Sequence, residues 1–514
     1  MKAFWRDILV VLIVAAVKIA LYFAVISGAE GPVFTSHGFI RSNDHGEYVS
    51  PIDNLAETGV YSLRQGGEPY AGRLPGFVFP HILFRILFSE EAALLLLGIF
   101  IAGMSLWASV ALFRLMLRHT GSIVWSGMAL LAVQGLPYYF HWDWTLHPNS
   151  LALSCLLLAL DFSDRYFRDK KNVLLLAAGF FMAWLFMLRG VTVLFIPVAT
   201  VCILVFMKRD GMSLRLTVSG LCLFLLPLIV AETAWIARNY ASLGRFIPLQ
   251  TSFVPGVSSD YREYDHNSRT KMSLMVLREL IDCWGGDNFW YFKGGDMNWF
   301  VDAGNAVPAE TQFRDIVFGG GLTAVKLESL KKDVLFSFAD EGDQRSLDSL
   351  ENVIIRKSQE YRSAFISEHP FYAYTAAPFY RLRNFLVKNP AQDWPGPSFE
   401  SAGTPGKLLK LGSVALYAAG LLLFPLALFA RGIKCPLTIM CVLLVFAAVF
   451  TFGFLINTAH YSYFIYGYAP VWITVCIAGC GITKKLSSPA RKAADGKNNS
   501  DKNRLQDDLS YMQQ

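Results

Sequence analysis

Long apolar runs separated by short polar stretches extend along most of the chain. A run of roughly 17–25 apolar residues is long enough to cross a bilayer as a helix. Candidate windows of this kind lie near residues 8–26, 92–113, 123–140, 150–162, 173–188, 190–207, 216–237, 408–430, 437–455 and 464–482. The pattern predicts an all-α polytopic membrane protein with about ten transmembrane helices, so both termini are expected on one side of the membrane.

The composition agrees with this prediction and excludes other classes of protein. Hydrophobic residues make up 54% of the 514 residues, and charged residues make up only 17%. A soluble globular chain carries about 25% charged residues, and disordered, collagen-like and disulfide-rich chains have other compositions again. Lipid is therefore expected to replace water around much of the protein.

The basic residues predict which way the helices run, because Lys and Arg are retained on the cytoplasmic side during insertion. Lys2 and Arg6 precede the first window, which lacks a small-residue cleavage site, so we expect a retained helix and a cytoplasmic N-terminus. The loops at 141–149 and 456–463 contain no Lys or Arg. The basic residues fall in the alternating loops and are Arg114, Arg118, Arg165, Arg168, Lys170, Lys171, Lys208, Arg209, Arg215, Arg431 and Lys434. The net charge of +6 thus divides into a basic cytoplasmic side and an acidic outer side. The absence of evident disulfides and the basic cytoplasmic tail fit a multi-pass protein of a bacterial inner membrane.

Four regions follow from this topology. Residues 1–237 form an N-terminal membrane module with a first external loop at 27–91, and residues 238–406 form a large extracytoplasmic domain that is mainly helical. Residues 407–483 carry the C-terminal membrane helices, and 484–514 are a disordered cytoplasmic tail. Helical spacing predicts a surface helix at 47–58 and amphipathic helices at 323–337 and 346–367.

Two acids of the first external loop are candidate catalytic residues. Asp44 can accept a proton from an acceptor hydroxyl, and Glu47, three residues later, shares its helical face and can orient it or bind a cation. The alternative is a helix cap, with Asp44 at the N-cap and Glu47 at the third helical position.

The second external loop combines an acid with aromatic rings. In the run from His141 to Pro148, Asp143 lies between Trp142 and Trp144, which is a common way to hold a sugar through ring stacking and hydroxyl contacts. His147 is a further substrate-binding candidate, and Asp143 with His147 can also be considered as ligands of a divalent metal. The alternative is an aromatic belt at the membrane surface.

Three arginines at the external ends of spans are candidate phosphate ligands: Arg189, Arg238 and Arg73. The planar guanidinium binds two phosphate oxygens at once and stays charged. Arg189 interrupts the apolar stretch 173–207. A single crossing there would leave basic residues outside, so we expect two short helices with Arg189 at their external turn. Surface arginines that snorkel from the bilayer are the alternative.

Together these features resemble the GT-C class of polytopic glycosyltransferases, and in particular the bacterial lipopolysaccharide-core sugar transferase, aminoarabinose transferase and protein O-mannosyltransferase types. The resemblance covers about 1–250 and 365–482. The matching stretches are Asp44-His-Gly-Glu47-Tyr48, Ala56-Glu-Thr-Gly59-Val-Tyr61, Arg73-Leu-Pro75-Gly76, Pro148-Asn-Ser150, Trp235-Ile-Ala-Arg238-Asn239-Tyr240, Gly244-Arg-Phe-Ile-Pro248, His369-Pro370, and His460-Tyr461-Ser-Tyr463 ahead of Pro470.

The resemblance implies an inverting glycosyltransferase of the cell envelope with its active site on the extracytoplasmic face. The donor would be a polyprenyl-phosphate-linked sugar, and the acceptor a hydroxyl of a lipid, glycan or protein. Asp44 takes the place of the family's catalytic base, and Asp143 that of the acid in its second external loop. His460 and Tyr461 would line the rim of the site, but His460 stands where relatives often have Arg. No nucleic-acid partner is expected.

Two other functions fit parts of the pattern. An O-antigen ligase or polymerase also has about ten or more spans and one large external loop, but depends on arginines in that loop. A secondary transporter would place ionisable groups at mid-membrane in paired broken helices. Here Lys18 and Glu232 are the ionisable residues lying well within spans, and no internal repeat is evident. The long acidic first loop favours the glycosyltransferase.

Overall fold

The computed structural model describes most of the membrane helices and part of the large loop. The described residues are 2–23, 33–41, 45–67, 69–135, 141–250, 299, 308–312, 318–319, 321–338, 344–376, 378–379, 382, 386, 403–429, 435–451 and 464–483. Asp44, His460, Tyr461 and the tail 484–514 lie outside these ranges, so the predictions made for them stay predictions.

Helices dominate the described residues, and each predicted apolar window overlaps one of them. They are α1 (Lys2–Leu21), α4 (Glu90–Thr120), α5 (Ile123–Gln134), α7 (Pro148–Asp169), α8 (Asn172–Leu188), α9 (Phe195–Arg209), α10 (Leu214–Leu243), α17 (Thr404–Leu428), α18 (Pro436–Phe450) and a last helix, Ile465–Thr483. Five described helical stretches are long and apolar enough to span a membrane. The chain is thus a multi-pass membrane protein, and the total of ten crossings stays a prediction.

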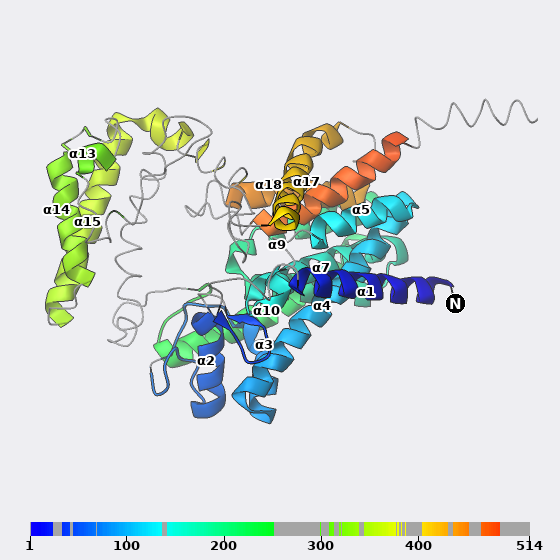
Figure 1. Ribbon diagram of the computed structural model, residues 1–514, viewed down its shortest axis with the longest axis horizontal. Coiled ribbons are helices and arrows are strands. Elements are labelled where there is room, and N and C mark those ends of the chain that lie inside the picture. The colour runs from blue at the N-terminus through cyan, green and yellow to red at the C-terminus, as the bar shows by residue number, and fades with distance from the viewer. Residues whose placement is uncertain are drawn as a thin grey trace, which may run out of the picture.

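The segments that the charge pattern predicts to be external are partly helical as well. The first loop contains a two-stranded antiparallel pair, β1 (Val33–Phe34) and β2 (Ile40–Arg41), followed by the α2 helix. The predicted surface helix at 47–58 is confirmed by α2 (His45–Thr58). In the large loop, α13 (Ala309–Gln312) precedes α14 (Ala324–Phe338) and α15 (Gln344–Glu368), which confirm the two predicted amphipathic helices to within two residues. Figure 1 shows α13, α14 and α15 set apart from the membrane helices.

Local sequence signals account for several helix boundaries. The Ser213 hydroxyl accepts a hydrogen bond from the Leu216 amide and caps the start of α10. Gly121 and Gly244 end α4 and α10 in the left-handed region, with φ of 65° at each, which a residue without Cβ adopts at little cost. Arg189 separates α8 from a short 3-10 turn, η4 (Gly190–Thr192), as the break in the apolar pattern predicts.

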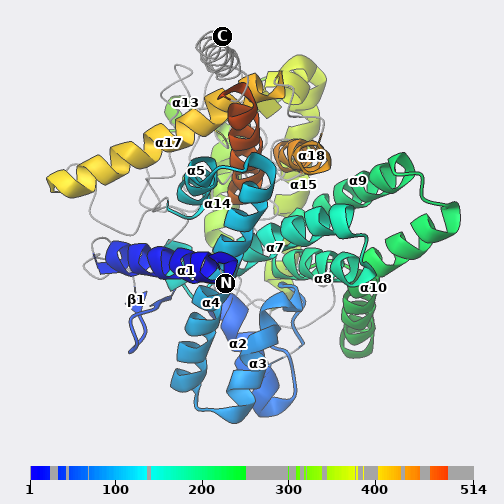
Figure 2. The same cartoon turned by 90° about the vertical axis from the view of Figure 1, so that its right-hand side faces the viewer.

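The core of the protein lies around α7, which packs between α4 and α8 (Figure 2). Leu151 and Leu156 are fully buried although α7 was predicted as a membrane span, because neighbouring helices rather than lipid surround it. The α8 and α10 helices approach so closely that a Cβ on Gly179 would lie 2.0 Å from the carbonyl oxygen of Phe224. Close backbone approach at a small residue is a common basis of helix packing in membranes.

One end of the bundle gathers the charges that the sequence assigns to the cytoplasm. Arg118 Nε donates to Asp164 at 2.9 Å, and His119 Nε2 lies 2.7 Å from the other oxygen of the same carboxylate. Arg114 pairs with Asp7 of α1 at the same end. The structure therefore brings α1, α4 and α7 together as the charge pattern requires, while the side of the membrane that this end faces stays a prediction.

Candidate functional site

The opposite end of the bundle carries the described part of the predicted first external loop, which packs on α8 and α10. Within it α2 packs against α3 (Val78–Leu87). The Asp53 carboxylate links the two helices, since its Oδ1 accepts from Arg85 Nε at 2.9 Å and lies 3.2 Å from His81 Nε2. The short turn η2 (Pro75–Phe77) joins this pair to α8, where the Trp184 indole donates to the Gly76 carbonyl at 2.9 Å.

The start of α2 carries an ion pair between two of the predicted site residues. Glu47 pairs with Arg73, and the Arg73 guanidinium lies over the Tyr48 ring, 5.0 Å from its centroid. Both charged side chains remain partly exposed. Asp44 is the residue immediately before His45, the first residue of α2. The predicted base therefore lies three residues before Glu47 in the sequence.

Arg189, at the end of α8, is bonded to residues of α2 and α7. Its Nη1 donates to the Tyr48 hydroxyl at 2.6 Å, and its Nε donates to Asn149 Oδ1 at 2.9 Å. Its Nη2 lies 3.3 Å from His147 Nε2. Asn149 Oδ1 also accepts from the Tyr466 hydroxyl of the last helix at 2.9 Å. Among the described residues the cluster contains two arginines, Arg73 and Arg189, and one acid, Glu47, so its net positive charge suits an anionic ligand.

His147 forms the N-cap of α7 and connects this cluster to Trp142. Its Nδ1 accepts from the Asn149 amide at 3.3 Å, and its ring lies 4.8 Å from that of Trp142 at an angle of 33°. Burial lowers the pKa of His147 well below its usual range, and the nearby Arg189 charge acts in the same direction. The imidazole is therefore neutral near pH 7, and because Nδ1 accepts from the Asn149 amide, Nε2 carries the proton and cannot also accept from Arg189.

Asp143 occupies a separate, closed network. Its carboxylate pairs with Lys18 of α1 through one oxygen and accepts from the Ser150 hydroxyl through the other. Lys18 Nζ also donates to Ser105 Oγ at 2.6 Å and to Gln134 Oε1 at 2.9 Å. Asp143 is only 4% exposed. These bonds describe a structural ion pair, and the catalytic role suggested by the resemblance stays a prediction.

A metal site at Asp143 and His147 has no third ligand in the part of the chain that the structure describes. No group of three His, Cys, Asp or Glu side chains suited to a metal ion occurs among the described residues. Asp143 contacts Lys18 and Ser150, whereas His147 contacts Arg189 and the Asn149 amide. The two candidate ligands thus belong to different hydrogen-bond networks.

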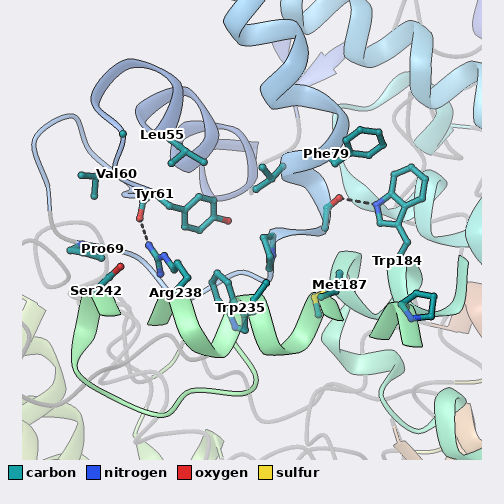
Figure 3. A pocket seen from close by; sticks show the side chains of 18 of the residues that line it. Leu55, Val60, Tyr61, Pro69, Phe79, Trp184, Met187, Trp235, Arg238 and Ser242 are labelled. Atoms are coloured by element: carbon teal, nitrogen blue, oxygen red, sulfur yellow. Dashed lines mark hydrogen bonds between the residues drawn. The ribbon is translucent and has the colours of Figure 1, made fainter. Parts of the chain in front are cut away.

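Arg238 is positioned by carbonyl oxygens of the first loop. Its Nη1 donates to the Tyr70 carbonyl at 2.7 Å and its Nη2 to the Tyr61 carbonyl at 2.9 Å. The guanidinium lies 5.2 Å from the centroid of the Tyr61 ring and 5.4 Å from that of Trp235. Arg238 therefore holds the loop against α10, and it also forms part of a cavity wall (Figure 3).

This cavity is an apolar groove of about 780 Å³ between the first loop and helices α8 and α10. Its lining is almost entirely hydrocarbon and aromatic, with Arg238 as the charged residue. The lining residues are Leu55, Gly59, Val60, Tyr61, Pro69, Pro75, Gly76, Val78, Phe79, Phe180, Ala183, Trp184, Met187, Pro227, Ala231, Ala234, Trp235, Arg238 and Ser242. A groove with this lining fits an acyl or polyprenyl chain better than a sugar.

The groove and the Arg189 cluster are adjacent along the chain at two points. Pro75 lines the groove two residues after Arg73, and Met187 lines it two residues before Arg189. An elongated amphipathic ligand can therefore place a hydrocarbon chain in the groove and an anionic group near the arginines. The apolar residues of the groove favour contact with a hydrocarbon chain, and the arginines favour contact with an anionic group.

Sequence reasoning missed several residues of this site. Tyr48, Asn149 and Tyr466 complete the Arg189 cluster, and Trp235 with Trp184 builds the groove. Tyr48, Asn149 and Trp235 stand inside the quoted motifs, which was the available signal for them. Tyr466 lies in an apolar window where one more aromatic residue carries no signal.

His45, at the start of α2, makes the external loop sensitive to acid. Burial lowers the pKa of His45 from 6.5 to about 4. The unfolded chain therefore binds a proton as pH falls through 6.5 while the folded protein does not, so stability is lost between pH 6.5 and 4. The loss reaches about 2 kcal/mol at pH 5. We expect the thermal midpoint to fall less between pH 7 and pH 5 in His45→Gln than in the parent, and equal shifts would contradict this.

Comparisons with known proteins add the following findings. No protein-family model matches the chain, and no curated protein matches it. It is similar to a crystal structure of ArnT from Cupriavidus metallidurans bound to undecaprenyl phosphate, over 93% of this chain and 78% of that one, with 12% identity and a TM-score of 0.34. The apo structure of the same ArnT covers the same shares, with 13% identity and a TM-score of 0.30.

Proposed function

We propose that the chain is an inverting membrane glycosyltransferase of the GT-C class. It moves a sugar from a polyprenyl-phosphate donor to a hydroxyl of a lipid, glycan or protein acceptor on the extracytoplasmic face. The observation that carries the proposal is the apolar groove of about 780 Å³ lying beside the Arg189 cluster. The order of motifs in the first and second external loops supports it independently.

The groove suits the hydrocarbon part of such a donor. One of its walls comes from the apolar helices α8 and α10 and the other from the first loop, so a lipid chain can enter it along the two helices. Phe79 of the groove wall and Val230 on α10 are at least half exposed, which is stable in contact with lipid but not with water. A nucleotide-sugar donor would need a polar pocket for base and ribose, whereas this lining is apolar.

The arginines suit the phosphate part. Arg73 and Arg189 lie within two residues of groove-lining positions, and Arg238 is in the groove wall. Cations near the bond that breaks stabilise the charge that develops on the leaving phosphate, at a few kcal/mol for each well-placed donor. All three guanidinium groups also have protein partners, namely Glu47 for Arg73, Tyr48 and Asn149 for Arg189, and two loop carbonyls for Arg238, so their contribution to the phosphate is chiefly their positive charge.

The chemical step needs one base and one leaving group. Asp44 accepts the proton of the acceptor hydroxyl, whose oxygen attacks the anomeric carbon. The bond from that carbon to the donor phosphate oxygen breaks, and the polyprenyl phosphate leaves with the bonding electron pair. Attack opposite to the leaving group inverts the configuration of the sugar. Glu47 with Arg73 would hold the start of α2 in place during the reaction.

A transfer assay with defined donors tests the proposal. The purified chain is reconstituted in liposomes with a radiolabelled sugar on polyprenyl phosphate, or with the same sugar on a nucleotide, together with an envelope lipid extract as acceptor. We expect label in the acceptor fraction from the lipid donor alone, with no translocation of free sugar. Transfer from the nucleotide sugar alone, or sugar flux without transfer, would overturn the proposed function.

A further inference from the structure

Two buried asparagines in the outer half of the bundle each accept a hydrogen bond from an arginine. In the first, Arg238 Nη1 donates to Asn239 Oδ1 at 2.8 Å. Asn239 Nδ2 in turn donates to the Ile247 carbonyl at 3.0 Å, and the side chain is fully buried. Both ends of this carboxamide therefore have protein partners, and it acts as a closed structural link between α10 and the segment that follows.

In Asn149, by contrast, only the amide oxygen has protein partners within the described part of the chain. Its Oδ1 accepts from Arg189 Nε at 2.9 Å, from Arg189 Nη2, and from the Tyr466 hydroxyl at 2.9 Å. The residue is 1% exposed, and its Nδ2 has no hydrogen-bond partner among the described residues. Because the two contacts from Arg189 are purely donating, the oxygen must face them, and exchanging the amide oxygen and nitrogen would set donor against donor.

An unpaired buried donor is expensive, because the group loses its water without regaining a bond. A bound ligand is one way in which such a donor gains its partner. The surroundings indicate what that ligand is. Asn149 is the second residue of the 22-residue helix α7, whose N-terminus carries partial positive charge, and it lies beside Arg189 and the neutral His147. Donation from Arg189 to the amide oxygen also makes the Nδ2 hydrogens better donors.

Arg189 itself is less available to a ligand than its charge suggests. Its Nε and Nη2 hold Asn149, and its Nη1 holds the Tyr48 hydroxyl. The arginine thus positions and polarises the carboxamide, while the amide nitrogen faces away from the donors that hold its oxygen. The guanidinium contributes its charge, and Asn149 contributes a hydrogen bond of defined direction.

We propose that Asn149 Nδ2 donates to an anionic phosphate oxygen of the bound substrate at the N-terminus of α7. Asn149 is thus a substrate-binding residue and Arg189 the residue that positions it. The inference rests on the proposed function, because it identifies this phosphate as the phosphate of the polyprenyl-linked sugar donor. The shared chemistry is a phosphate monoester or diester oxygen, and free phosphate offers the same group.

The test compares Asn149→Asp with the matched variant Asn239→Asp in the full-length chain in nanodiscs. Binding of polyprenyl phosphate, polyprenol and inorganic phosphate is measured together with the thermal midpoint without ligand. The Asn149→Asp substitution keeps an acceptor for Arg189 but presents a carboxylate to the phosphate. We expect the Kd for polyprenyl phosphate to rise at least tenfold in this variant, with binding of polyprenol unchanged and a thermal midpoint no lower than that of the parent.

Asn239→Asp is expected to lower the thermal midpoint by several degrees, because it removes the donor that the Ile247 carbonyl requires. An equal fall in Asn149→Asp would show that Nδ2 has a protein partner and would overturn the inference, as would an unchanged Kd for polyprenyl phosphate. Binding of inorganic phosphate that depends on Asn149, with binding of polyprenyl phosphate that does not, would assign the site to free phosphate rather than the lipid, against the inference. Normal sugar transfer by Asn149→Asp, with an unchanged Kd for polyprenyl phosphate, would support the proposed function and contradict the role of Asn149. Binding of polyprenyl phosphate that depends on Asn149, without any sugar transfer by the parent protein, would support the role of Asn149 and contradict the proposed function.

Discussion

Replacing Asp44 by Asn is expected to lower the rate of sugar transfer by about 10²–10⁴-fold, the usual contribution of a positioned general base. The amide cannot accept the proton of the acceptor hydroxyl, yet it keeps the size of the side chain and its ability to cap the α2 helix. Binding of the polyprenyl-phosphate donor should therefore change little. Single-turnover transfer at saturating donor, with donor affinity measured separately, distinguishes the chemical step from binding.

Asp53→Asn is the matched control for this variant. Asp53 is another acid of α2, but its carboxylate is engaged by Arg85 and His81 of α3. Its replacement should weaken the packing of α2 on α3 and lower the thermal midpoint, with a far smaller effect on the single-turnover rate of the folded fraction. Near-normal transfer by correctly inserted Asp44→Asn would show that another group accepts the proton and would remove Asp44 from the mechanism.

The sequence located most of the helices because a bilayer imposes a strict rule on length and polarity. Each apolar window overlaps a helix, and even the loop helices α14 and α15 begin and end within two residues of their predicted bounds. What the pattern could not supply is the environment of each helix. A fully apolar helix looks the same whether lipid or protein surrounds it, so the burial of α7 between α4 and α8 follows only from the packing.

The candidate site was predictable in part for a similar reason. Arg189 could be identified because burying a charge within a long apolar stretch costs free energy unless the charge has partners. In the structure it has partners in α2 and α7. The partner of Asp143 could not be identified in the same way. Lys18 lies 125 residues earlier in the sequence, in a different helix. No sequence pattern indicates which residue a lysine in an apolar helix will pair with. The same limit hid the loop carbonyls that hold Arg238.

Lys18→Met is expected to destabilise the protein by about 3–5 kcal/mol, because it leaves the Asp143 carboxylate buried without its cation. Lys18 and Asp143 are 6% and 4% exposed, so water cannot replace the lost partner. Ser150 still donates to Asp143, but one hydroxyl does not compensate a buried negative charge. Denaturant titration in detergent micelles, followed through tryptophan fluorescence, measures the change as a shift of the unfolding midpoint at constant slope.

The double variant Lys18→Met with Asp143→Leu separates the cost of an unpaired charge from the value of the pair. Since an apolar replacement of a buried ion pair is often neutral or stabilising, we expect it to recover most of the loss seen in Lys18→Met. The exposed pair of Lys170 and Asp210 is the control, because Lys170→Met should change stability by less than about 1 kcal/mol. If Lys18→Met were no more harmful than Lys170→Met, the carboxylate would have another partner or a proton. Asp143 would then be available for the catalytic role that the resemblance implies.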